Sequence, residues 1–191
     1  AFAGAVVAAL AACGSSAGDD SGDSGDGGGG SDGAYPRTVA TLYCDVTIPT
    51  APTRVVALSF ASADELLSLG VTPITVAADP KTLDDMTPWV ADEIRATADA
   101  SLTTASYELN VEAIAAAKPD LIVAQTWQIK DKAAFDQLNA VAPTVAPDSD
   151  ALNVDWDVRL RTTADAVDKA DEAQKLIADI QAEFAAVGDA V

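Results

Sequence analysis

The side chains in this sequence that could do chemistry are aromatic and amide groups, not acid-base or nucleophilic ones. The chain contains no histidine, and its two cysteines are Cys13 and Cys44. Ser-His-Asp and Cys-His catalytic systems and histidine metal sites are therefore excluded from these residues. What remains is a set of candidate ligand contacts just after short apolar runs, such as "QTWQ" at residues 125–128. Aromatic faces and amide tips suit the binding of an organic ligand.

These side chains need a scaffold that brings the ends of several strands together. Residues 35–49 alternate polar and apolar types, which predicts an antiparallel hairpin at the entrance to the domain. "RVVALS" at 54–59 is typical of a strand covered on both faces. The next helix is expected to start at a capping box of Ser62 and Glu65 and to end at a left-handed Gly70. "TPITVAA" then predicts a second strand.

The alternation of strand and helix recurs twice. Asn110 is placed to cap a helix that stops before Pro119, and a buried strand is expected at 121–124. A helix carrying Phe135 then leads to a short strand around 144–145. The predicted fold class is α/β, a parallel-sheet lobe with helices on both faces, followed by a long helix.

The first 34 residues differ in composition from the rest. Residues 1–13 end in "LAAC", which resembles the lipobox of bacterial lipoproteins and implies the remnant of a signal peptide with lipidation at Cys13. The alternative is an unmodified cysteine buried in an N-terminal helix. Residues 14–34 are mostly Gly, Ser and Asp, which predicts a disordered tether. The implied location is extracytoplasmic and lipid-anchored at the cell membrane, and the net charge of -19 argues against nucleic acid as a partner.

Three segments carry a family resemblance. "APTRVVALSFASADELLSLGVTPITVA" at 51–77, "NVEAIAAAKPDLIVA" at 110–124 and "LNAVAPTV" at 138–145 occur in this order. They resemble the N-terminal lobe of the iron-siderophore and cobalamin substrate-binding proteins of ABC importers. The resemblance implies two α/β lobes joined by one long helix, with the ligand in the cleft between them. It also implies a binding protein, not an enzyme, whose partners are an ABC permease and its ATPase.

The long inter-lobe helix is predicted over residues 155–191. Apolar residues from Leu160 to Val187 recur at helical spacing, and no glycine or proline interrupts them before Gly188. About 30 residues would form a rod of about 45 Å, and the alternative is a coiled-coil partner helix. Residues 35–154 then form the N-terminal ligand-binding lobe, and we expect the second lobe to be missing from this sequence.

Candidate ligand contacts follow from the rule that open parallel sheets bind ligands beyond the carboxyl ends of their strands. Trp127 matches a position where the family places an aromatic residue against the ligand. Trp89 and Tyr107 lie in loops that carry aromatic or arginine contacts in the family, although loop aromatics also pin loops to the core. The full set of candidates is Ser59, Phe60, Lys81, Trp89, Tyr107, Gln125 and Trp127.

Positive charge is scarce near these candidates. The family frequently uses arginines to hold anionic chelates, but no arginine follows a predicted strand here. Lys81, Arg95 and Lys130 are the bases nearest to the strand ends in the sequence. The sequence therefore favours a neutral or cationic ferric hydroxamate over a trianionic ferric catecholate, unless the second lobe supplies positive charge.

Glu112 stands in the "N-x-E-x-I" part of the second segment. At the matching position the family has a glutamate that docks into arginine pockets on the permease. A second role, compatible with the first, is a carboxylate in the first helical turn that complements the helix dipole.

The expected function is that of a monomeric, lipid-anchored binding protein that captures an Fe(III)-siderophore, with no cofactor and no metal site of its own. One alternative is cobalamin or haem as the ligand. An enzyme related to nitrogenase would need cysteine ligands, for which Cys44 alone is poor support. A structural surface lipoprotein would instead present an apolar interaction patch. Cys44 is expected to be a small buried apolar residue, with a disulfide partner beyond Val191 as the alternative.

Overall fold

The computed structural model describes residues 35–86, 92–104, 106, 108–151 and 153–189. Its first element is a two-stranded antiparallel hairpin of β1 (Arg37–Ala40) and β2 (Asp45–Ile48). Val39, Val46 and Ile48 are buried, whereas their neighbours within the two strands, Thr38, Ala40, Asp45 and Thr47, are exposed. The alternating pattern in the sequence therefore predicted the hairpin correctly.

A four-stranded parallel sheet forms the centre of the lobe, in the order β4-β3-β5-β6. Its strands are β3 (Val55–Ala57), β4 (Thr75–Val76), β5 (Leu121–Val123) and β6 (Thr144–Val145). Strands β3 and β5 are neighbours although about 65 residues separate them in the chain, with Val55 opposite Leu121 and Ala57 opposite Val123. The carboxyl ends of these two central strands consequently lie side by side.

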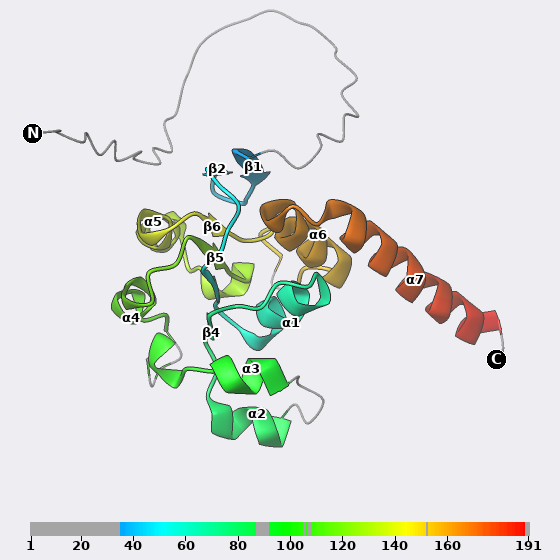
Figure 1. The fold of residues 1–191 in the computed structure, drawn as a ribbon, viewed down its shortest axis with the longest axis horizontal. Coiled ribbons are helices and arrows are strands. Elements are labelled where there is room, and N and C mark those ends of the chain that lie inside the picture. Colours follow the sequence, from blue (N-terminus) through cyan, green and yellow to red (C-terminus); the bar gives the residue numbers. More distant parts are fainter. Residues whose placement is uncertain (1–34, 87–91, 105, 107, 152, 190–191) are drawn as a thin grey trace, which may run out of the picture.

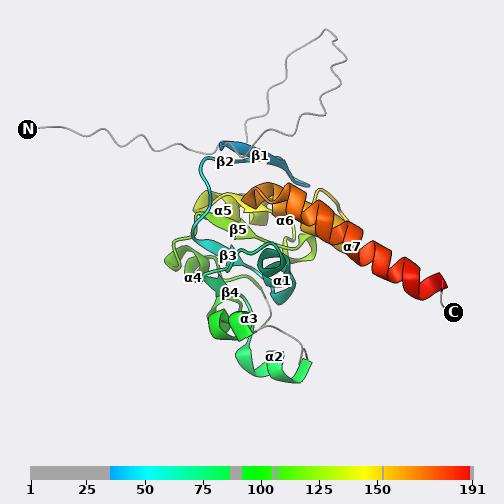
Figure 2. The ribbon, with the colours of Figure 1, turned by 45° about the vertical axis from the view of Figure 1, so that its right-hand side comes forward.

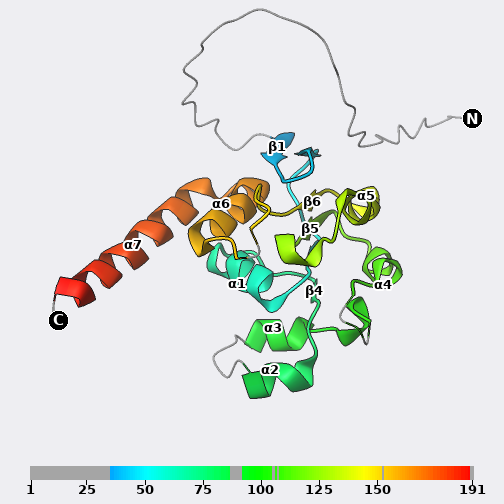
Figure 3. The ribbon, with the colours of Figure 1, turned by 180° about the vertical axis from the view of Figure 1, so that it is seen from behind.

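Helices cover both faces of the sheet, as the sequence predicted. They are α1 (Phe60–Ser68), α2 (Pro80–Met86), α3 (Asp92–Thr97), α4 (Val111–Ala116), α5 (Lys132–Val141), α6 (Trp156–Val167) and α7 (Ala170–Asp189), with 3-10 turns η1 (Ala100–Leu102) and η2 (Thr126–Gln128). Helices α4 and α5 lie on one side of the strands, and α1 and α6 lie on the other (Figures 1 and 3). Ile114 and Phe135 on one face, and Leu66 and Ala164 on the other, are fully buried. This close packing fixes where the strand ends point.

Helix α1 begins three residues earlier than the sequence predicted. Its N-cap is Ser59, whose Oγ accepts a hydrogen bond from the Ser62 backbone N–H at 3.1 Å, so the prediction of Ser62 as the cap was wrong. The predicted C-terminus is confirmed, because Gly70 has φ +77° and the Val71 N–H donates to the Leu66 carbonyl at 2.9 Å. Moving the cap to Ser59 places Glu65 on the second turn of α1, where it can face the interior.

The predicted single helix over 155–191 is divided into α6 and α7. Asp168 separates them with a left-handed backbone of φ 59° and ψ 46°, a conformation that Asp tolerates better than most residues. Its carboxylate pairs with Arg37 of β1, and the Tyr35 hydroxyl donates to the Ala166 carbonyl at 3.1 Å. The hairpin therefore holds α6 against the lobe, while the long helix α7 leads away from it (Figure 2). Because no glycine or proline marks the break, the sequence pattern missed it.

Candidate functional site

The chain leaves the two central strands in opposite directions. From β3 it passes through α1 to β4 at one edge of the sheet, and from β5 it passes through η2 and α5 to β6 at the other. Such a switch in direction opens a crevice beyond the carboxyl ends of the two strands, which is where open α/β sheets bind ligands. The segments that leave β3 and β5 at this point are 58–60 and 124–128.

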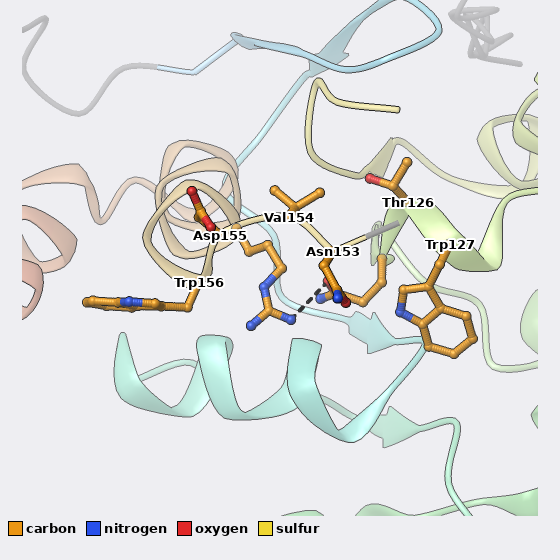
Figure 4. Close-up of a pocket in the computed structure, with 8 residues that line it drawn as sticks. Thr126, Trp127, Asn153, Val154, Asp155 and Trp156 are labelled. Carbon is orange, nitrogen blue, oxygen red and sulfur yellow. Dashed lines mark hydrogen bonds between the residues drawn. The ribbon is translucent and has the colours of Figure 1, made fainter. Parts of the chain in front are cut away.

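A pocket of about 260 Å³ lies at this crevice. It is lined by Gln125, Thr126, Trp127, Asn153, Val154, Asp155, Trp156 and Arg159. Figure 4 shows Trp127 and Trp156 at opposite ends of the pocket, with Asn153 between them. The side chains of Trp127 and Trp156 are 59% and 37% exposed, so both rings remain available to a ligand. Two aromatic faces around a polar centre suit an organic ligand with a carbon-rich outer surface.

The turn that carries Trp127 is fixed by the two glutamines beside it. The Gln125 N–H donates to Gln128 Oε1 at 3.0 Å, and Gln128 Nε2 donates to the Leu58 carbonyl at the end of β3. Gln125 is only 3% exposed, and its Nε2 donates to Ser62 Oγ at 3.0 Å. Because both glutamines point inward, the turn presents Trp127 outward on a rigid base.

A second pocket of about 380 Å³ adjoins the first, between α1, α6 and α7. Trp156 and Arg159 line both pockets. Phe60 at the start of α1 and Leu176 and Ile180 of α7 give the second pocket an apolar wall. The start of α6 thus forms the partition between a polar pocket and a more apolar one.

A partly buried charged pair lies beside the start of α6. Arg159 Nε is 3.6 Å from Glu65 Oε1, and the side chains of Glu65 and Arg159 are 10% and 29% exposed. Thr163 Oγ1 donates to Glu65 Oε2 at 2.9 Å, and Arg159 Nη1 donates to Gln125 Oε1 at 3.4 Å. Burial raises the pKa of Glu65, although the hydrogen bond from Thr163 and the charge of Arg159 oppose that rise. Gln125 links this pair to the turn that carries Trp127.

The raised pKa of Glu65 predicts a pH dependence of stability. Glu65 binds a proton in the folded state at pH values where the unfolded chain, with a glutamate pKa near 4.5, has lost it. The free energy of unfolding contributed by Glu65 therefore increases as the pH falls through the raised pKa towards 4.5, and it is constant below both values.

The measurement is urea unfolding of wild type and Glu65→Gln between pH 7 and 4. We expect the free-energy difference between them to shift in favour of wild type as the pH falls. Gln keeps an acceptor for Thr163, so the comparison isolates the titration from the hydrogen bond. A difference that does not change with pH would contradict a raised pKa.

The structure brings some of the sequence-predicted residues to the pockets and not others. Gln125 and Trp127 line the first pocket, and Phe60 lines the second. Ser59 is buried as the cap of α1, and Lys81 is exposed on α2 and lines neither pocket. Glu112 is exposed in the first turn of α4. Trp89, Tyr107 and Cys13 lie outside the described residues.

Sequence reasoning missed Asn153, Trp156 and Arg159. Trp156 and Arg159 are three residues apart, which places them on one face of α6. That spacing was visible in the sequence, but nothing there showed that the start of this helix lies across a pocket from the residues that follow β5. The expectation that no arginine lies near the strand ends was therefore wrong, because Arg159 arrives from a distant segment.

The described part of the chain offers neither a grouped set of metal ligands nor a membrane-spanning helix. Among its residues, no three His, Cys, Asp or Glu side chains are grouped so that they could hold a metal ion. No helix in this part of the chain is long and apolar enough to cross a membrane. Cys44 packs against the core but is only half-buried, so it is less buried than the sequence predicted.

Curated proteins of Bacillus subtilis (strain 168) resemble this chain. The one named "Probable siderophore-binding lipoprotein YfiY" is 39% identical over 132 residues, which is 69% of this chain and 38% of the relative. "Fe(3+)-citrate-binding protein YfmC" is 35% identical over 134 residues, or 70% of this chain and 40% of that protein. The matched region thus spans well under half the length of these relatives.

Solved structures share the fold. A periplasmic solute binding protein from Mycobacterium smegmatis is 33% identical with a TM-score of 0.64, covering 79% of this chain and 53% of that one. PiaA of Streptococcus pneumoniae in complex with ferrichrome is 23% identical with a TM-score of 0.65, covering 78% and 50%, and shows the fold alone.

The family model described as "Periplasmic binding protein" matches residues 55–191, from the first strand of the parallel sheet through α7. This family is one of binding proteins and not a class of enzymes. A match of that extent, the identity to curated relatives and the parallel-sheet lobe agree with one another, and the chain belongs to the periplasmic binding protein family.

Proposed function

We propose that this chain is the N-terminal, ligand-binding lobe of a lipid-anchored substrate-binding protein, which captures a ferric siderophore and delivers it to an ABC permease and its ATPase. The observation that carries the proposal is the pocket beyond β3 and β5, with Trp127 and Trp156 at its two ends. A ferric siderophore presents mostly carbon to its surroundings. Two rigid aromatic rings can cover that surface, and binding then does not have to order a flexible loop around the ligand.

The relatives support the class of ligand. Two of the curated proteins carry siderophore or ferric citrate binding in their names, and solved neighbours were crystallised with ferrichrome and with staphyloferrin B. These names differ in the type of chelate, so they support iron chelates as a class and not one member of it.

Glu112 is proposed as a contact with the permease. It is exposed in the first turn of α4, on the side of the sheet opposite α1 and α6, and the described residues form no ion pair with it. A carboxylate without a local base is available to an arginine on a partner. Cys13 is proposed as the lipidation site, with residues 14–34 as the tether between the anchor and the lobe.

The test is a titration of the full gene product, without its lipid anchor, in which tryptophan fluorescence reports binding. The ligands are a ferric hydroxamate, a ferric catecholate and cobalamin. We expect saturable quenching at sub-micromolar concentration by a ferric chelate, because a bound chelate would lie against Trp127 and Trp156. Saturation by cobalamin alone would replace the siderophore with a corrinoid ligand. No response to any of the three by folded protein would refute the proposed function.

A further inference from the structure

We propose that Glu65 determines the specificity of this pocket by balancing the charge of Arg159, so that the pocket accepts an electroneutral ferric chelate in preference to a polyanionic one. The inference rests on the proposed function and narrows its substrate class. It assigns a role to Glu65, which does not line the first pocket but lies beside the Arg159 guanidinium and accepts a hydrogen bond from Gln125.

The charges that line the two pockets are unequal. Arg159 is the one basic residue among the residues that line them. Asp155 lines the first pocket, and Asp64 and Glu65 line the second. One positive charge therefore faces three carboxylates, and a polyanion entering the crevice would meet no uncompensated cation on these walls.

Arg159 contacts Glu65 and Gln125. Its Nε is buried, makes no hydrogen bond within the described part of the chain, and lies 3.6 Å from Glu65 Oε1. Its Nη1 donates to Gln125 Oε1 at 3.4 Å. This hydrogen bond is long and therefore weak, so a ligand could compete with Gln125 for Nη1. The charge that stops Arg159 from attracting anions strongly is thus the carboxylate of Glu65 and not a hydrogen bond to Gln125.

Hydrogen bonds hold the Glu65 carboxylate beside Arg159. Thr163 Oγ1 and Gln125 Nε2 donate to its two oxygens at 2.9 and 3.3 Å. Its side chain is 10% exposed, so little water screens its field at Arg159. Because α1, α6 and the end of β5 all fix it, Glu65 cannot turn away when an anion approaches.

The chemistry of ferric chelates makes this charge balance selective. Fe(III) bound by three hydroxamates is electroneutral, whereas Fe(III) bound by three catecholates carries three negative charges. Both present apolar surface to Trp127 and Trp156, so the aromatic faces alone do not distinguish them. With the guanidinium compensated, the excess of carboxylates on the pocket walls repels the trianion, and such like-charge repulsion lets a site reject a competitor of similar shape.

The experiment titrates the full gene product with an electroneutral ferric trihydroxamate and a trianionic ferric tris-catecholate, following tryptophan fluorescence. We expect wild type to bind the trihydroxamate more tightly. In Glu65→Gln we expect affinity for the tris-catecholate to rise about tenfold and affinity for the trihydroxamate to stay within about twofold of wild type. Circular dichroism and thermal unfolding establish that each variant is folded.

Two control variants separate the pair from the general field of the protein. Asp64→Asn removes the same charge from the preceding residue of α1, which lines the second pocket but makes no ion pair with Arg159 among the described residues. It should therefore raise the affinity for the tris-catecholate less than Glu65→Gln does. Arg159→Gln combined with Glu65→Gln should abolish the gain for the tris-catecholate, because no guanidinium remains to be released.

The outcomes distinguish this inference from the proposed function. If wild type prefers the tris-catecholate, or if Asp64→Asn produces the same gain as Glu65→Gln, the role of Glu65 is overturned while ferric chelate binding stands. If neither chelate binds folded wild type, the proposed function fails and this inference fails with it.

Discussion

Replacing Trp127 with alanine is expected to weaken ferric chelate binding by about 2 kcal/mol, or about thirtyfold. The indole is 59% exposed in the absence of ligand and stands at one end of the first pocket (Figure 4). Its loss removes a large apolar face that costs little conformational entropy to order on binding, because the turn beneath it is already fixed by Gln125 and Gln128. Isothermal titration calorimetry measures the change without relying on the fluorescence of the residue removed.

Two further variants decide whether the effect belongs to the pocket. Trp127→Phe keeps an aromatic face and should retain most of the affinity. Phe184 of α7 is an aromatic residue that is 69% exposed and lines neither pocket, so Phe184→Ala should leave the affinity unchanged. Equal losses from Trp127→Ala and Phe184→Ala, or no loss from either, would show that the ligand binds elsewhere.

Glu112→Ala is expected to reduce iron uptake by about tenfold or more while leaving chelate affinity unchanged. Glu112 lies in the first turn of α4, on the opposite side of the sheet from Phe60 and Trp156, so its removal should not reach the ligand. Loss of a charge that pairs with a permease arginine leaves that arginine unpaired in the interface. The measurement is transport of labelled ferric chelate in cells or in vesicles that contain the permease and its ATPase.

The matched control for Glu112 is Glu93→Ala. Glu93 is also an exposed carboxylate in the first turn of a short helix, α3, so it reproduces the change in net charge and in helix dipole. Uptake should be normal in this variant. If both variants transport at the wild-type rate, Glu112 acts only through the dipole of its own helix.

The sequence by itself determined the elements of the lobe. Continuous apolar runs predicted β3 and β5 because strands covered on both faces consist mostly of apolar residues. Asn110 predicted the start of α4, and its Oδ1 indeed accepts a hydrogen bond from the Ala113 N–H at 3.2 Å. The end of β5 then located Gln125 and Trp127 at the edge of the sheet where the first pocket lies. Each of these features depends on residues close together in the chain, which is why a sequence pattern records it.

Only the tertiary structure decided what lies opposite Trp127. Trp156 and Arg159 reach the pocket because α6 packs across α1, where the hairpin contacts of Tyr35 and Arg37 hold it. The ion pair of Asp168 with Arg37, at the break between α6 and α7, and the pairing of Glu65 with Arg159 likewise join residues that are far apart in sequence. Helical spacing shows which side chains share a face, but the partner of that face is set by long-range packing, and here that packing placed the charge in the pocket.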